Sequence, residues 1–152
     1  FELSDVIQNS VKGLKPMADN KQVEVNLKLD ENISVMADPN MIQSVVRNLF
    51  SNAIKFTQRG GLVTIKTEVS DMSKACISIT DNGIGIEKAL LSKLFDLSNS
   101  QHTPGTENEK STGLGLILVK DFVERNHGTL TIDSEKGKGT VVSFTLPLIQ
   151  LG

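Results

Sequence analysis

A short apolar strand that ends in a carboxylate and two glycines is the most informative segment of this sequence. Cys76-Ile77-Ser78-Ile79-Thr80 alternates apolar and polar residues and is rich in β-branched side chains, which predicts a strand with one buried face. Because side chains alternate along a strand, Asp81 falls on the same face as Ile77 and Ile79. A carboxylate on an apolar face is costly unless a hydrogen-bond donor binds it.

The residues after Asp81, Asn82-Gly83-Ile84-Gly85, leave two interpretations open. The exocyclic amine of a purine is one suitable donor for the carboxylate, and the glycines would let a flat ring approach the backbone. An ordinary Asn-Gly turn is the other interpretation, and this segment alone favours the turn.

Size, charge and cysteine content exclude several classes of protein. A chain of 152 residues, 38% of them hydrophobic, is a single globular domain with a sizeable core. Its net charge of −2 offers no basic surface for nucleic acid, and no apolar run is long enough to span a membrane. The single cysteine, Cys76, fits a reducing compartment. The chain begins at Phe1, not at methionine, so we expect a fragment of a longer protein.

Periodicity and turn residues predict an α+β fold, a two-layer α/β sandwich with helices on one face of a mixed, mostly antiparallel sheet. Asp38 and Pro39 are typical of a helix start. Residues 98–111 have no hydrophobic period, and loops of this length are usually lids or binding loops. We expect helices at residues 3–18, 39–57, 86–95 and 114–126, and strands at residues 23–29, 33–37, 62–69, 74–80, 129–133 and 140–146.

The second predicted helix carries polar residues beside its apolar stripe. At 100° per residue, Asn48, Asn52 and Lys55 lie within about 60° of one another. Asparagine is a mediocre helix former, so two in mid-helix suggest a specific role. Amide oxygens are suitable ligands for Mg²⁺, and a lysine ammonium binds phosphate. Solvated residues on a surface helix explain this pattern at least as well.

Two further glycine pairs follow. Thr112-Gly113-Leu114-Gly115-Leu116 opens a helix, where free amides and the helix dipole favour an anion, although a flexible loop–helix junction also fits. Gly137-Lys138-Gly139-Thr140 on its own predicts a turn. Neither is a dinucleotide fingerprint or a P-loop.

The order of these segments resembles the catalytic and ATP-binding (HATPase_c) domain of bacterial sensor histidine kinases, in the GHKL ATPase superfamily. The resemblance covers nearly the whole chain and implies one domain, residues 1–152, of the Bergerat ATP-binding fold with an ATP lid at about residues 96–113. Residues 47–57 resemble the Asn box, 81–86 the first Gly box, 94–95 the Phe box, 105–116 the lid and second Gly box, and 137–140 the last Gly box.

The resemblance also implies a role for each matched residue. Asp81 accepts from the adenine amine, and Thr140 supports the same edge through water. Asn52, assisted by Asn48, holds Mg²⁺ and Lys55 contacts phosphate, which makes these three the implied catalytic residues. The remaining ATP-binding residues are Phe56, Gly83, Ile84, Gly85, Lys110, Thr112, Gly113, Leu114, Gly115 and Leu116.

Several positions depart from the family's pattern. The lid has Ser111 where close relatives often have glycine, and Leu97 replaces a common second Phe with no arginine after it. Lys110 is then the cationic lid residue that could reach phosphate. Asn48 stands where ATP-hydrolysing relatives have a glutamate base, and an amide cannot take a proton from water, so we expect poor hydrolysis.

The implied activity is that of a protein-histidine kinase in two-component signal transduction. His102 and His127 do not lie in a segment like the family's phosphoacceptor helix, so the acceptor histidine is expected on a separate upstream dimerisation domain. Further implied are a response-regulator partner, no nucleic-acid or direct membrane contact, a monomeric isolated domain, and a place in the cytoplasmic part of a membrane-anchored sensor. A serine kinase of the anti-sigma-factor type and a nucleotide-gated, non-catalytic interaction module stay open as alternatives.

Overall fold

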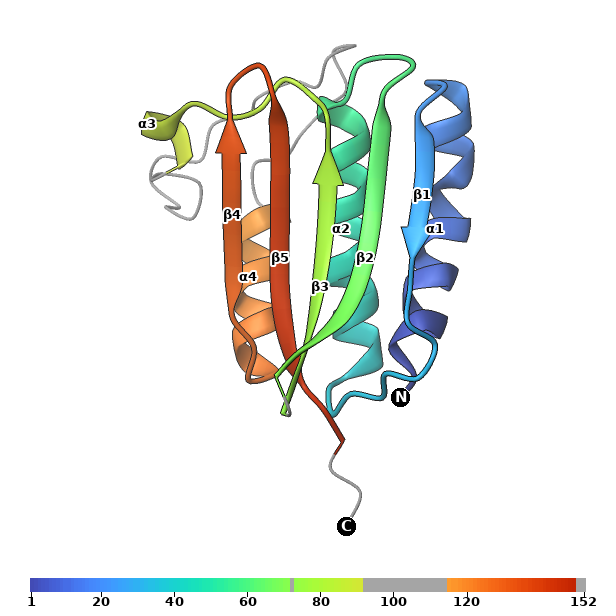
Figure 1. The fold of residues 1–152 in the computed structure, drawn as a ribbon, viewed down its shortest axis with the longest axis vertical. Helices are drawn as coiled ribbons and strands as arrows, with labels where there is room; N and C mark the ends of the chain where they lie inside the picture. The colour runs from blue at the N-terminus through green and yellow to red at the C-terminus, as the bar shows by residue number, and fades with distance from the viewer. Residues whose placement is uncertain (72, 92–114, 150–152) are drawn as a thin grey trace.

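A five-stranded sheet and three long helices form two layers. The computed structural model describes residues 1–71, 73–91 and 115–149. The strand order is β1-β2-β3-β5-β4, with β1 parallel to β2 and every other neighbouring pair antiparallel. The elements are α1 (Leu3–Asn20), β1 (Glu24–Lys28), α2 (Pro39–Phe56), β2 (Leu62–Asp71), β3 (Lys74–Asp81), α3 (Lys88–Leu91), α4 (Gly115–Arg125), β4 (Leu130–Glu135) and β5 (Gly139–Pro147) (Figure 1). The predicted sandwich is confirmed.

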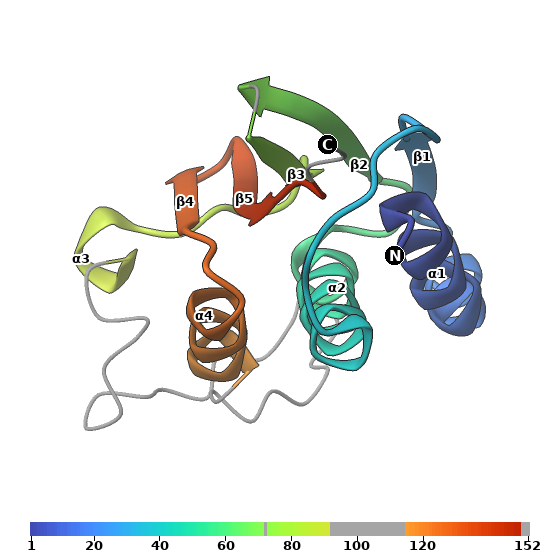
Figure 2. The same cartoon turned by 90° about the horizontal axis from the view of Figure 1, so that it is seen from below.

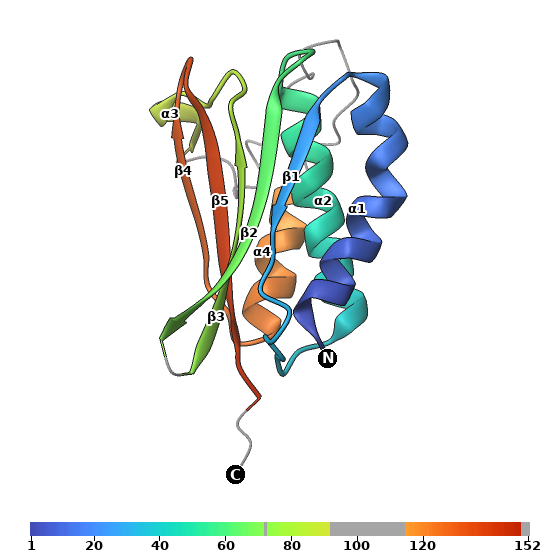
Figure 3. The same cartoon turned by 45° about the vertical axis from the view of Figure 1, so that its right-hand side comes forward.

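The helices α1, α2 and α4 all cover the same face of the sheet, with α2 in the middle (Figures 2 and 3). Burial alternates along β3, where Ala75, Ile77, Ile79 and Asp81 face the helices. The apolar stripe of α2 packs against them, and each large side chain buried there contributes about 1.5–3 kcal/mol. No helix of the described residues is long and apolar enough to cross a membrane.

Helix α2 begins and ends at well-defined contacts. Asp38 caps its start, accepting from the amides of Asn40 and Met41 at 2.9 and 3.2 Å, as its sequence predicts. At the other end, the Phe56 carbonyl accepts from the Ile84 amide at 3.1 Å. The last turn of α2 is therefore hydrogen-bonded to the segment that follows Asp81.

Two sequence predictions need correction. The predicted strand at residues 33–37 is wrong, because this segment makes only isolated bridges, Glu2 with Ser34 and Val35 with Leu148. Ile33 and Val35 are buried. The alternation of apolar and polar residues in this segment therefore reflects burial against the first and last described residues, not membership of the sheet. The helix predicted at residues 86–95 is observed only as α3, and residues 92–95 lie outside the described residues.

Lys21, just after α1, stabilises the end of α2. Its side chain is buried, and Nζ donates to the carbonyls of Ile54 at 3.0 Å and Lys55 at 2.9 Å. The last carbonyls of a helix have no partner within the helix and carry its negative end, so a cation there is favourable.

We expect Lys21→Met to lower the free energy of unfolding by about 2–3 kcal/mol, because it removes a buried, charged donor from two carbonyls at the end of α2. Urea denaturation of the purified domain measures the change. Lys15→Met is the matched control on the exposed face of α1, with an expected effect within about 0.5 kcal/mol. Equal stability of the two variants would contradict the role of Lys21.

Candidate functional site

A cavity lies between α2 and the sheet, beside the start of α4. Most of its wall is apolar, and the polar side chains on it come from Asn52, Asp81 and Thr140. Such a wall, apolar with a few placed polar groups, is typical of a small-molecule site. The lining residues are Leu49, Asn52, Ala53 and Phe56 of α2, Ile79, Asp81, Gly85 and Ile86 in and after β3, Leu116 of α4, and Ile132, Thr140 and Val142 of the last two strands.

Asp81 is the last residue of β3 and is 8% exposed. It is paired across the sheet with Thr140 of β5, and its Oδ1 accepts from the Gly83 amide at 2.9 Å. Burial raises the pKa of the Asp81 carboxyl, and hydrogen bonds from the Gly83 and Thr140 amides oppose that rise. A desolvated carboxylate held by backbone donors thus forms part of the cavity wall.

The glycines after Asp81 are required by contacts between backbones. A Cβ on Gly83 would lie 2.0 Å from the Phe56 carbonyl oxygen. A Cβ on Gly85 would lie 2.1 Å from the Glu135 carbonyl oxygen, and its φ of +71° also favours glycine. These residues therefore let the segment after β3 pack against α2 and the β4–β5 turn, a reason that differs from the ring approach inferred from the sequence.

Asn48 and Asn52 both face the beginning of α4. The Asn48 amide nitrogen donates to the Ser44 carbonyl at 2.8 Å and to Ser44 Oγ at 3.4 Å, which leaves Oδ1 on the opposite side. A Cβ on Gly115 would lie 3.3 Å from Asn48 Oδ1 and 4.0 Å from Asn52 Nδ2. The Asn48 amide oxygen is the kind of hard ligand that Mg²⁺ takes, whereas the Asn52 atom nearest Gly115 is the amide nitrogen, a hydrogen-bond donor.

Among residues 1–71, 73–91 and 115–149, no group of three or more His, Cys, Asp and Glu side chains could hold a metal ion. The metal roles of Asn48 and Asn52 stay predictions from the sequence. Asn52 lies on the cavity wall, while Asn48 lines a different groove along α2 with Ser44, Arg47 and Ser51.

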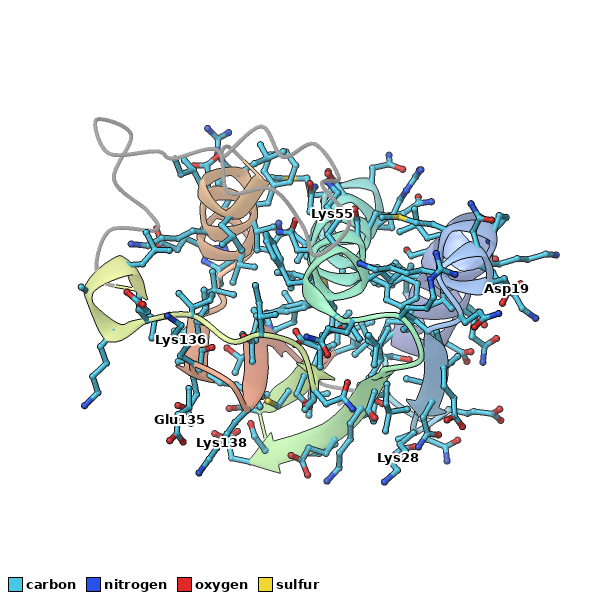
Figure 4. The ribbon with its side chains drawn as sticks, turned by 90° about the horizontal axis from the view of Figure 1, so that it is seen from above. Asp19, Lys28, Lys55, Glu135, Lys136 and Lys138 are labelled. Carbon is cyan, nitrogen blue, oxygen red and sulfur yellow. The ribbon has the colours of Figure 1, made fainter. Side chains whose placement is uncertain are left out.

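Six of the predicted ATP-site residues, Asn52, Phe56, Asp81, Gly85, Leu116 and Thr140, line one cavity, and their roles toward ATP stay predictions. The cavity wall does not include Lys55, Gly83 or Ile84. Lys55 lies at the end of α2 (Figure 4), and Ile84 is 37% exposed. Their roles stay predictions. Lys110, Thr112, Gly113 and Leu114 lie outside the described residues.

Four residues that line or support the site were missed by reasoning from the sequence. Ile132 and Val142 line the cavity, Ser134 contacts Thr140, and Lys21 holds the end of α2. Strand alternation could have found Val142, two residues after Thr140, but no local pattern distinguishes Lys21 or Ser134.

Comparison with known proteins gives consistent matches over this region. The family model of the histidine kinase-, DNA gyrase B- and HSP90-like ATPase matches residues 37–150. The chain is 38% identical to the non-motile and phage-resistance protein of Caulobacter vibrioides, covering 97% of this chain and 18% of that protein. It is also 38% identical to the sensor histidine kinase WalK of Bacillus subtilis, covering 78% of this chain and 20% of WalK. The chain thus spans about a fifth of the length of these relatives.

Solved structures share the fold. A solved chain of the mycobacterial sensor histidine kinase MprB superposes with a TM-score of 0.85 at 24% identity, covering 99% of this chain and 97% of that solved chain. The catalytic domain of the histidine kinase ThkA gives a TM-score of 0.82 at 26% identity, covering 97% of this chain and 93% of that domain. The sheet, the cavity and these matches agree with one another. The chain belongs to the histidine kinase-, DNA gyrase B- and HSP90-like ATPase family.

Proposed function

We propose that this domain binds ATP with Mg²⁺ and transfers the γ-phosphoryl group to a histidine on a separate dimerisation and phosphoacceptor domain, in two-component signalling. One observation carries the proposal. A buried carboxylate, Asp81, lines the same cavity as Asn52, whose amide faces the start of α4 together with that of Asn48.

The inner end of the cavity suits a purine base. Asp81 accepts a hydrogen bond from the exocyclic amine, and desolvation strengthens this contact because water does not compete for it. The apolar wall formed by Ile79, Ile132 and Val142 covers a ring face and excludes water. Thr140 supports the same edge of the base, directly or through a water molecule.

The phosphate end lies toward α4. Asn52 and Asn48 orient the triphosphate, Lys55 contributes positive charge, and Mg²⁺, when bound, neutralises phosphate charge. Phosphoryl transfer depends mainly on such positioning and charge stabilisation. Because Asn48 supplies no base, ATP hydrolysis by water stays slow, and the phosphoryl group is kept for the protein acceptor.

The partners follow from the same proposal. The parent protein would carry the acceptor histidine in an upstream dimerisation domain and pass the phosphoryl group on to a response regulator. One similar structure is ThkA in complex with the response regulator protein TrrA, with a TM-score of 0.78 and 23% identity. We further propose that the isolated domain is monomeric and belongs to the cytoplasmic part of a sensor.

Mixing the purified domain with γ-labelled ATP, Mg²⁺ and its own dimerisation domain tests the proposal. We expect acid-labile label on a histidine of the dimerisation domain and no label when either domain is left out. Label on serine would replace the histidine-kinase proposal with the serine-kinase alternative. Calorimetric ADP binding without any label would favour a nucleotide-gated interaction module.

A further inference from the structure

Ser134 is the second-last residue of β4. Its hydroxyl joins two segments beside the part of the cavity proposed to bind the base. Its Oγ lies 2.8 Å from the Ile86 amide nitrogen, 3.0 Å from the Gly139 carbonyl oxygen and 2.7 Å from Thr140 Oγ1. Ser134 and Thr140 are directly paired across β4 and β5. The hydroxyl therefore connects the segment after Asp81 with the hairpin that carries Thr140.

The donors and acceptors around Ser134 decide where the protons go. A hydroxyl has one proton and two lone pairs. The Ile86 amide must donate, so it uses one lone pair of Ser134 Oγ, and the Gly139 carbonyl must accept, so it takes the Ser134 proton. The remaining lone pair of Ser134 accepts the proton of Thr140. Thr140 Oγ1 is then left only with lone pairs for a ligand.

Two contacts join the β4–β5 turn to residues 84–87 and support the hydrogen bonds of Ser134. The Gly137 amide donates to the Ile84 carbonyl at 2.7 Å, and Lys136 Nζ lies 2.6 Å from Glu87 Oε1. Figure 4 shows Lys136 beside the segment that leads to α3. The ion pair raises the pKa of Lys136 and lowers that of Glu87, but both groups are exposed, so its contribution to stability is small. The backbone hydrogen bond between Gly137 and Ile84 is therefore the main contact that keeps the Ile86 amide near Ser134.

An obligate acceptor at Thr140 has a consequence for the base. Asp81 and Thr140 are paired across β3 and β5 and both line the cavity. A 6-aminopurine supplies a donor to them, directly or through a water that donates to Thr140. At position 6 a 6-oxopurine has a carbonyl acceptor where the 6-aminopurine has its amine donor. Although the N1–H of the 6-oxopurine is a donor, O6 meets the acceptors of Asp81 and Thr140 without a proton between them, which costs affinity.

We infer that Ser134 is a positioning residue: it commits the Thr140 hydroxyl to accepting and so makes the cavity prefer 6-aminopurine over 6-oxopurine nucleotides. The inference deepens the proposed function and rests on ATP binding in this cavity. Ser134 itself does not line the cavity wall.

Calorimetric titration of Mg²⁺·ADP and Mg²⁺·IDP tests this inference through the ratio of the two dissociation constants. In Ser134→Ala, the Thr140 proton is released and can donate to a 6-oxo group, so the preference for ADP should fall roughly tenfold. In the Thr140→Val background, the same replacement should leave the ratio unchanged, as a double-mutant cycle requires.

Ser143→Ala is the matched control, because Ser143 lies on β5 with its side chain on the opposite face of the sheet, and it should keep the wild-type ratio. Ser134→Cys, with a weaker donor, should give an intermediate ratio and replaces Ser134→Ala if that variant does not fold. Equal loss of both affinities in Ser134→Ala, or equal binding of ADP and IDP by the wild type, would overturn the inference but leave the proposed function standing. No ADP binding by the folded wild type would overturn both.

Discussion

Asp81→Asn should reduce ATP affinity at least about 100-fold while the domain stays folded. The replacement removes a charge-assisted acceptor and can present an amide donor to the adenine amine, which together cost about 3 kcal/mol or more. Isothermal titration of Mg²⁺·ADP and of a non-hydrolysable ATP analogue measures the loss. Retained affinity would show that Asp81 does not bind the base.

The stability of this variant separates a lost contact from a lost fold. Burial raises the pKa of Asp81, so the folded domain holds that proton more tightly than the unfolded chain does. Its contribution to stability is then present below the ordinary pKa and is lost as the pH rises through the raised value. At neutral pH the buried carboxylate is a cost that asparagine removes. Asp81→Asn should therefore be no less stable than wild type in urea, and the exposed control Asp133→Asn should keep both stability and affinity.

Asn52→Ala should lower Mg²⁺-dependent phosphorylation of the dimerisation domain by about 100-fold or more, the size of effect seen when a single positioning or charge-stabilising group is lost from an active site. The expected cause is loss of the amide that faces the start of α4 from the cavity wall. Initial rates with γ-labelled ATP measure the transfer. Titration of ADP with and without Mg²⁺ gives a second readout, in which the variant should lose the gain in affinity that Mg²⁺ provides.

The control for this prediction lies at the other end of the same helix. The Asn40 side chain is exposed, and the cap at this end uses its backbone amide, so Asn40→Ala should leave transfer and Mg²⁺ dependence unchanged. If Asn52→Ala kept a normal rate and a normal Mg²⁺ effect, the proposed metal role of Asn52 would be wrong.

Local pattern was enough for most elements and for the orientation of the main site residues. Period-two alternation placed Asp81 on the buried face of β3, and the structure confirms it. The Asp38 cap and Pro39 predicted the start of α2, and the helical period placed Asn48 and Asn52 on one side of it. Each of these properties depends on neighbouring residues in the chain, and for that reason sequence reasoning reached them.

Contacts between distant parts of the chain were not accessible in this way. The segment at residues 33–37 alternates like a strand, yet its neighbours are the two ends of the chain. Lys21 meets the Ile54 carbonyl 33 residues away, and Ser134 meets the Ile86 amide 48 residues away. A single lysine after a helix or a single serine in a strand carries no local signal of such a partner.

The sequence by itself determined a strand that ends in a buried carboxylate, a helix with two asparagines beside its apolar stripe, and the family to which their order belongs. Only the tertiary structure decided that β5 lies between β3 and β4, which pairs Asp81 with Thr140 and brings Ser134 to the Thr140 hydroxyl. Strand order and register depend on which apolar faces pack together across the whole domain, and side-chain hydrogen bonds form only after that packing is set.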